Sequence, residues 1–215
     1  MRLLFAVLIS FVLLALPAAA GPVVTVLSDS GNVYSHSGSY VLGWEFSVGS
    51  PVQVTSLGFW DYLGDGFHTL AGGLTGADVG IWNAAQTLLV STTVASTDPI
   101  SNVLPDGSGF RFDSLTSPYT LQPGTYYIGG TNNGTESYVF YPGSSVSYDP
   151  AVTWLSGQYA YSGTLVFPGT SDCCTPAGWF GPNFTIGSDT VPEPGTGALF
   201  VGAGLWLAWL KRRRW

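Results

Sequence analysis

Short runs in which large apolar residues alternate with small polar ones dominate residues 21–187. In residues 40–48 every second residue from Leu42 onwards is a large apolar one, which predicts a strand with one buried face. Residues 52–62 begin in one phase of this alternation and continue in the other. We therefore expect a β-bulge near Thr55-Ser56, because a bulge shifts the phase of a strand by one residue.

Further alternating runs follow at short intervals. Residues 78–82 place Val79 and Ile81 on one side, and residues 83–86 connect them to residues 87–94 as a predicted hairpin. The other predicted strands cover residues 23–27, 125–130, 136–141, 152–156, 158–167 and 183–187.

Two local signals add detail. Phe110 and Phe112 alternate around Arg111, which predicts a strand whose Arg111 side chain faces outward. Pro123-Gly124 predicts a type II turn, provided that Gly124 adopts the left-handed conformation.

No part of this region shows a sustained helical period or a fixed repeat. Many short strands without helices predict an all-β fold, and we expect an antiparallel β-sandwich of the jelly-roll kind rather than a closed barrel. The residues expected to supply its core are Trp44, Phe46, Phe59, Ile81, Phe112, Tyr126 and Ile128.

The first twenty residues have the pattern of a secretory signal peptide. Arg2 precedes an apolar run over residues 3–16, and the small residues 17–20 follow it. We expect cleavage between Ala20 and Gly21, with a retained N-terminal anchor as the alternative. The β-sandwich domain is therefore assigned to residues 21–187.

Residues 188–215 form a predicted linker and tail of different composition. Residues 195–210 are uncharged and, apart from Thr196, apolar, so they predict one C-terminal transmembrane helix near the lower length limit of about 17–25 residues. A basic end after such a helix favours a cytoplasmic C-terminus, and a buried helix of a soluble domain is the alternative. The helix is preceded by an extended motif and followed by a basic block: Val191, Pro192, Glu193 and Pro194, then Lys211, Arg212, Arg213 and Arg214.

This order of motif, apolar helix and basic terminus resembles the PEP-CTERM sorting signal of Gram-negative bacteria. The resemblance implies a chain that is exported, held in the inner membrane as a precursor, and recognised by an exosortase that cuts near the Pro-Glu-Pro motif. It also implies a final location at the cell surface or in the extracellular polysaccharide matrix. The strand segments LGWEFSV, VGIWN and YTLQPGTYYIGG, among others, resemble a sandwich domain of unknown function from secreted bacterial proteins.

Charge limits the partners of the exported domain. Of the six Lys and Arg residues in the chain, only Arg111 lies within residues 21–190, whereas all but one of the thirteen Asp and Glu residues do. Such a domain cannot neutralise phosphates, so the composition excludes nucleic acid as its partner.

Cys173 and Cys174 are adjacent. Neighbouring residues do not reach the usual Cα separation of a disulfide, which leaves a strained vicinal disulfide, cross-links to another chain, or two thiols. Export to an oxidising compartment favours an oxidised form.

Candidate chemistry is sparse. His36 and His68 lie in polar, Gly-containing segments and match no metal-ligand pair, and no G-x-S-x-G motif occurs. Asp61 and Asp65 flank a tight loop whose carboxylates could hold Ca²⁺, although turn formation is the simpler interpretation. We expect no catalytic residues and no other cofactor.

Exposed aromatic side chains are candidates for sugar contacts, because alternation cannot bury all of them. The candidates are Trp60, Trp82, Trp154, Trp179, Tyr159 and Tyr161; packing in the core is the alternative for each. We therefore predict an exported, non-enzymatic surface or matrix protein. A carbohydrate- or exopolysaccharide-binding module is the second interpretation, and a secreted hydrolase is the third.

Overall fold

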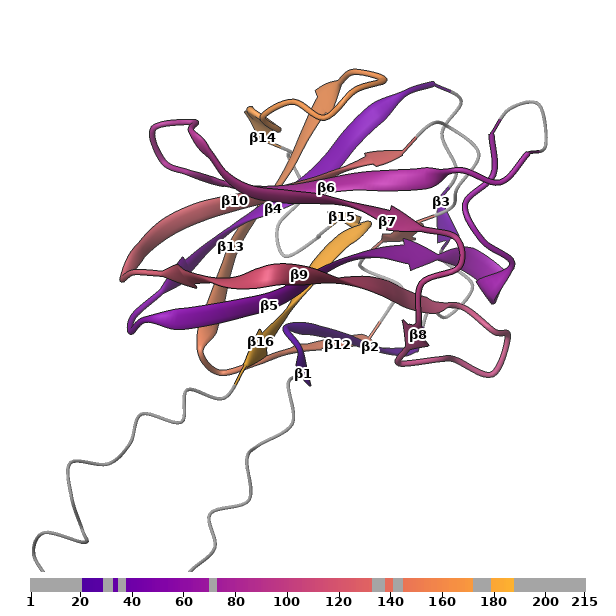
Figure 1. Cartoon of the computed structure of the whole chain (residues 1–215), viewed down its shortest axis with the longest axis horizontal. Coiled ribbons are helices and arrows are strands. Elements are labelled where there is room, and N and C mark those ends of the chain that lie inside the picture. Colours follow the sequence, from indigo (N-terminus) through magenta and orange to yellow (C-terminus); the bar gives the residue numbers. More distant parts are fainter. Residues whose placement is uncertain are drawn as a thin grey trace, which may run out of the picture. The chain divides into compact units, whose positions relative to one another are not determined.

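Two antiparallel β-sheets face each other across the core in a computed structural model of the chain (Figure 1). In spatial order, the five-stranded sheet contains β1 (Gly21–Pro22), β16 (Pro182–Gly187), β5 (Val52–Asp61), β9 (Gly109–Leu121) and β8 (Ile100–Ser101). The six-stranded sheet contains β14 (Thr170–Ser171), β13 (Val152–Tyr161), β4 (Tyr40–Val48), β10 (Gly124–Asn132), β6 (Gly76–Asn83) and β7 (Leu88–Ala95). The fold is therefore all-β, and the arrangement is that of a β-sandwich.

Smaller elements complete the architecture. A three-stranded sheet contains β15 (Trp179–Phe180), β11 (Tyr138–Phe140) and β3 (Val33–Tyr34), and a two-stranded sheet contains β12 (Ser145–Tyr148) and β2 (Val24–Ser28). The only helical element among the described residues is the short turn η1 (Tyr62–Gly64).

The structure describes residues 21–28, 33–34, 38–69, 73–132, 138–140, 145–171 and 179–187. All of them belong to one unit, Ala20–Asp189. The predicted signal peptide, the predicted sorting tail, His36 and the pair Cys173-Cys174 lie outside them. Within the described ranges no helix has the length and apolar character needed to cross a bilayer.

Aromatic side chains from both sheets form the centre of the core. The rings of Trp44 and Phe46 on β4 lie 5.9 and 5.1 Å from the ring of Phe184 on β16. The ring of Tyr126 on β10 lies 5.8 Å from that of Phe46. All the predicted core residues are buried except Phe112, which is partly buried against the cluster.

Most of the predicted strand patterns are confirmed. The alternating residues 42–48 are buried, and Val79 and Ile81 are fully buried. Residues 76–95 form the antiparallel hairpin β6–β7. The register of β5 against β9 and β16 shifts between Val54 and Ser56, which confirms the predicted bulge.

Two strand predictions need correction. Residues 152–156 and 158–167 were expected as separate strands, but β13 runs continuously over Val152–Tyr161 with an irregularity between Trp154 and Ser156. After Tyr161 the chain leaves the sheet, and residues 162–169 fold over the outer face of the sheet. Phe167 in this segment packs there against Trp82 and Tyr127. Strand β9 also extends to Leu121, well beyond the predicted Phe110–Phe112 segment.

The predicted type II turn at Pro123-Gly124 is wrong, because Gly124 is not among the residues with positive φ. The chain passes here from β9 in one sheet to β10 in the other. The Tyr126 hydroxyl donates a hydrogen bond of 2.7 Å to the carbonyl oxygen of Gln122, four residues upstream. This geometry is a tyrosine corner, a feature that fixes inter-sheet connections in sandwiches.

We expect Tyr126→Phe to lower the free energy of unfolding by about 1 kcal/mol, because it removes this hydrogen bond and keeps the packed ring. Urea unfolding should show a lower midpoint with an unchanged slope. Tyr161→Phe is the matched control, since the Tyr161 side chain is 74% exposed, and it should change stability by less than about 0.5 kcal/mol. Equal effects of the two variants would contradict a role for the corner.

Candidate binding surface

Two of the tryptophans predicted as candidate sugar contacts are buried. Trp60 is fully buried, with its ring 5.0 Å from that of Phe110, and Trp82 is only 4% exposed. These two side chains are therefore not exposed aromatic contacts, and for Trp60 the alternative of packing in the core is confirmed. Trp154 is half-buried against the core, and the side chain of Trp179 lies outside the described residues.

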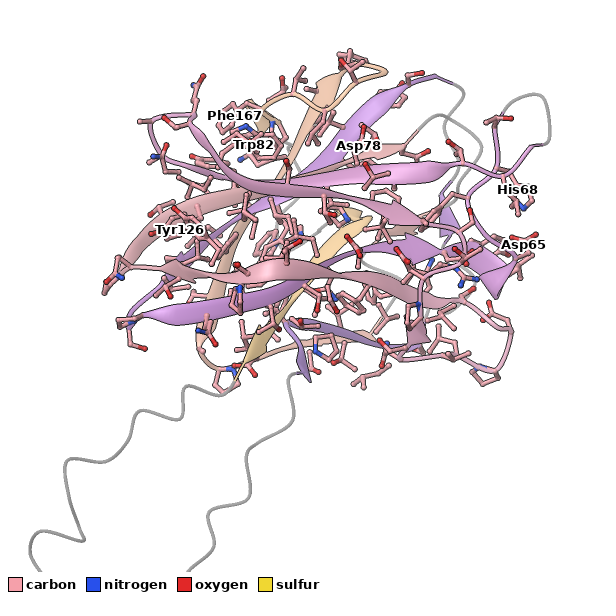
Figure 2. All side chains as sticks on the ribbon, in the orientation of Figure 1. Asp65, His68, Asp78, Trp82, Tyr126 and Phe167 are labelled. Carbon is pink, nitrogen blue, oxygen red and sulfur yellow. The ribbon has the colours of Figure 1, made fainter. Side chains whose placement is uncertain are left out.

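Trp82 does point away from the core, but another segment covers it. We call residues 162–169, between β13 and β14, the strap. The Phe167 ring of the strap lies beside the Trp82 ring (Figure 2), with 6.2 Å between the ring centroids. It also lies 4.9 Å from the Tyr127 ring. The strap thus buries aromatic side chains that strand alternation alone would leave exposed.

A row of glycines provides room for the strap. Gly80, Gly129 and Gly43 are direct cross-strand partners on β6, β10 and β4. A methyl group at Gly129 would lie 3.1 Å from Cγ of Pro168. A methyl group at Gly80 would lie 3.2 Å from Cδ2 of Leu165. The outer face of the six-stranded sheet therefore contains a shallow trough that the strap fills.

A polar network adjoins this trough. The carboxylate of Glu45 accepts hydrogen bonds of 2.8 Å from the hydroxyls of Tyr127 and Ser156. The Gln158 side chain donates to the hydroxyls of Ser156 and Ser171. Burial and the neighbouring Glu45 carboxylate raise the pKa of Tyr127. This network joins β10, β4, β13 and β14 and has a structural role.

A group of three aromatic side chains lies at one end of the same sheet. Tyr40 begins β4 and Tyr161 ends β13, and the two are direct cross-strand partners. Their ring centroids are 5.2 Å apart, and the Tyr159 ring lies 5.4 Å from that of Tyr161 at an angle of 89°. Tyr161 is 74% exposed, which agrees with its prediction as an outward aromatic. We call these three residues the tyrosine cluster.

The segments that carry the tyrosine cluster are uncharged. Residues 38–44 and 150–171 contain no Asp, Glu, Lys or Arg, and the turn after Tyr161 contains Ser162, Gly163 and Thr164. The Ser162 hydroxyl donates to the carbonyl oxygen of Thr164 and accepts a hydrogen bond from its N–H. The cluster is thus bordered by small polar residues, a suitable setting for an uncharged ligand.

Asp61 belongs to an internal ion pair. Its carboxylate is fully buried, accepts from Nε of Arg111 and accepts a 3.1 Å hydrogen bond from the Gly66 N–H. Arg111 also donates to the carbonyl oxygens of Asp98 and Gly64. The prediction of an outward Arg111 is therefore wrong, because its side chain is only 12% exposed.

Burial raises the pKa of the Asp61 carboxyl above its ordinary value, although the hydrogen bond and charge of Arg111 and the Gly66 N–H act in the opposite direction. The cost of removing the carboxylate from water thus exceeds its attraction to Arg111. The pair fixes the positions of the η1 loop and of the residues before β8.

The structure separates the two acids proposed as calcium ligands. Asp65 is 61% exposed, and its Oδ1 lies 3.5 Å from Nε2 of His68. Both residues are labelled in Figure 2. The Asp61 carboxylate instead faces inward to Arg111. Across the described part of the chain, no three His, Cys, Asp or Glu side chains gather as a metal site. Asp61 therefore has a structural role in place of the predicted metal contact.

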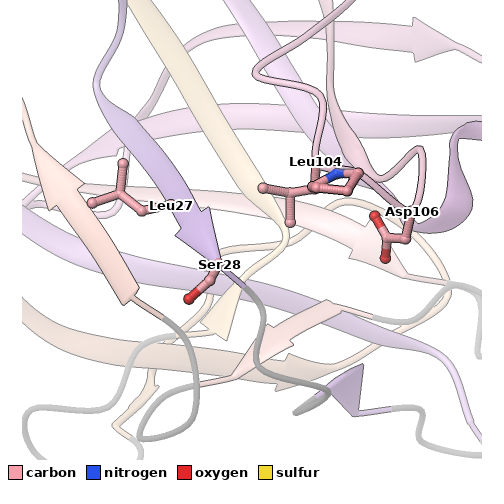
Figure 3. A pocket seen from close by; sticks show the side chains of 5 residues that line it. Leu27, Ser28, Leu104 and Asp106 are labelled. Carbon is pink, nitrogen blue, oxygen red and sulfur yellow. The ribbon is translucent and has the colours of Figure 1, made fainter.

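A hollow of about 310 Å³ lies between β2 and the loop before β9 (Figure 3). Leu27, Ser28, Leu104, Pro105 and Asp106 line it. Its described lining supplies one carboxylate, and these residues alone favour no particular chemistry.

Neither the models of known protein families nor the curated proteins give a match to this sequence.

Proposed function

We propose that the chain is an exported, non-enzymatic protein of the cell surface or extracellular matrix, sorted through its C-terminal tail. The observation that carries the proposal is the order of three elements: the motif 191–194, the apolar run 195–210 and the basic block 211–214. An apolar segment that ends in consecutive cations favours a halted, C-terminus-inside orientation. The resemblance of this order to the PEP-CTERM signal makes an exosortase of a Gram-negative bacterium the processing partner.

We further propose that the exported domain is of the jelly-roll kind, and the strand order supports this. Eight strands taken in chain order, β1, β4, β5, β6, β7, β9, β10 and β16, form two groups of four. One group has the order β1-β16-β5-β9 and the other the order β4-β10-β6-β7. This is the arrangement of two Greek keys, and β13 is an addition beside β4.

The charge of the domain agrees with a role outside the cell that involves neither nucleic acid nor anionic lipid. The one Arg of residues 21–190 is committed to Asp61 inside the fold. Its surface therefore offers no Lys or Arg to phosphate groups, which rely on such cations for binding.

A carbohydrate-binding module is a second candidate for the same exported domain. The observation that favours it is the tyrosine cluster, with its three-quarters exposed Tyr161. A secreted hydrolase is not proposed, because no observation on the described residues favours it.

Replacement of Pro192, Glu193 and Pro194 with alanine should leave the precursor uncut in the inner membrane of the native host. The alanines remove the extended elbow that separates the domain from the membrane segment. Cell fractionation and intact-mass analysis would detect the retained C-terminus. A matched control replaces Ser188, Asp189 and Thr190 with alanine and should be processed normally. Release of the same mature product from both variants would contradict the sorting proposal.

A further inference from the structure

We infer that the tyrosine cluster binds an uncharged polysaccharide, with the ring of Tyr161 as the central contact. This inference depends on the second candidate function proposed above and specifies its site and its ligand class.

Strand pairing fixes the geometry of the cluster. Tyr161 pairs with Tyr40, and Tyr159 pairs with Leu42, so all three tyrosines lie on one face of the β4–β13 ladder. The Tyr161 ring is inclined by 48° to one neighbour and by 89° to the other. The Tyr161 ring therefore contacts both of its neighbours, and these contacts reduce the ordering that a ligand must impose. Rigid aromatic side chains with few rotatable bonds lose little entropy on binding.

The chemistry of a tyrosine cluster fits the two kinds of surface on a sugar ring. A pyranose presents apolar C–H groups on its face and hydroxyls around its edge. The face of a Tyr ring can pack against the C–H groups, and its phenol oxygen can form hydrogen bonds with the sugar hydroxyls. Hydroxyls of Ser39, Ser162 and Thr164 lie on the same uncharged segments and enlarge the set of hydrogen-bonding groups.

Charge selects among polysaccharides. No cation lies on the segments that form the cluster, and the only one in residues 21–190 is held inside the fold by Asp61. Residues 21–190 contain twelve Asp and Glu residues. Their negative charge repels a polymer that carries uronate, sulfate or phosphate groups. An uncharged polysaccharide needs no cation for binding and is not repelled by the carboxylates.

Binding should be measured with the full-length chain in neutral detergent, by electrophoresis through native gels that contain one polysaccharide each. Dextran, mannan and xylan serve as uncharged probes, and alginate serves as the anionic probe. We expect at least one uncharged polymer to retard the protein and alginate to leave it unaffected. Tyr161→Ala should weaken retardation at least tenfold, and Tyr161→Phe, which keeps the ring, should weaken it less than threefold.

Leu74→Ala is the control, because it removes another exposed apolar side chain, 61% exposed, outside the cluster. It should bind as the unchanged protein does, and circular dichroism should show that all variants are folded. Three results would overturn the inference: no retardation by any uncharged probe, preference for alginate, or retardation that survives Tyr161→Ala. A Tyr161-dependent dimer in light scattering, without sugar binding, would assign the surface to a second copy of the chain.

The purified chain is used, so these outcomes do not depend on sorting in the cell. Failure of sugar binding would leave the processing proposal intact, and failure of processing would leave the binding result intact.

Discussion

Arg111→Met should lower the free energy of unfolding by about 3–5 kcal/mol, a large effect for a single substitution. Methionine keeps much of the volume of the side chain but leaves the buried Asp61 carboxylate without its cation. It also withdraws the donors to the carbonyl oxygens of Asp98 and Gly64. Urea unfolding followed by tryptophan fluorescence would give the difference.

The double variant Asp61→Asn/Arg111→Met provides the sharper test. Asparagine removes the stranded charge, and its side-chain oxygen can still accept from the Gly66 N–H. We therefore expect the double variant to be more stable than Arg111→Met alone. Asp65→Asn is the control, since that neighbouring acid is 61% exposed and its loss should cost less than about 0.5 kcal/mol. Additive losses at Asp61 and Arg111 would show that the pair is not coupled.

The pH dependence has a defined sign. The pKa of Asp61 in the folded state is raised above its ordinary value of 3.8. At a pH between the ordinary and the folded-state pKa, the folded protein therefore binds more protons than the unfolded chain. The stabilisation linked to this proton is fully present below pH 3.8 and is lost as pH rises through the folded-state pKa. Loss of Arg111 raises that pKa further. The penalty of Arg111→Met should therefore be smaller at pH 4 than at pH 7.

Alternation along the sequence predicted the core-facing side of several strands correctly. The alternate residues from Leu42 to Val48 and the pair Val79 and Ile81 are buried as expected, because a strand places every second side chain on the same face. The change of phase near Thr55 correctly indicated a bulge. These features are local, and a period of two is sufficient to find them.

Burial on the outer faces of the sheets could not be predicted in this way. Trp82 has an outward position in its strand, but the strap covers it. Arg111 instead pairs directly with the core residue Phe59, so its side chain lies on the same face as that residue and meets Asp61 there. Both the strap and the strand that carries Phe59 are distant in sequence from the residue they enclose. Alternation assigns a side chain to a face, whereas burial also depends on which loop returns over that face.

The tyrosine cluster was predictable only in part. The sequence marked Tyr159 and Tyr161 as candidates, but it did not pair them with Tyr40, which lies more than a hundred residues earlier. That pairing depends on β13 lying beside β4, an arrangement that a strand list does not contain. A single strand β13, rather than the two predicted strands, places Tyr161 at the strand end.

Asn183 links the beginning and the end of the domain. It is fully buried. Its Nδ2 donates to the Val24 carbonyl oxygen at 2.7 Å, and its Oδ1 accepts from the Val24 N–H at 3.1 Å. In the sequence, Asn183 begins a predicted strand and belongs to an Asn-Phe-Thr glycosylation motif. In the folded domain its amide forms hydrogen bonds with the backbone. It thus closes the fold by tying β2 to β16.

Asn183→Ala should cost about 3 kcal/mol of unfolding free energy. Val24 is also fully buried, so water cannot replace the lost partners, and each unpaired buried backbone group costs about 1–3 kcal/mol. For a domain of this size the midpoint of thermal unfolding should fall by roughly 6–12 °C. The Val24 amide should also lose protection from hydrogen exchange.

Asn83→Ala is the matched control for Asn183→Ala. The Asn83 side chain accepts a 2.9 Å hydrogen bond from the Thr87 N–H in an exposed turn, where water can take its place. Its loss should therefore cost only about 0.5 kcal/mol. If both alanine variants lose stability equally, or if Val24 keeps its protection in Asn183→Ala, then the buried amide does not hold β2. The anchor of that strand would then have to be sought in the backbone hydrogen bond from the Val23 N–H to the Phe184 carbonyl oxygen, 2.8 Å long.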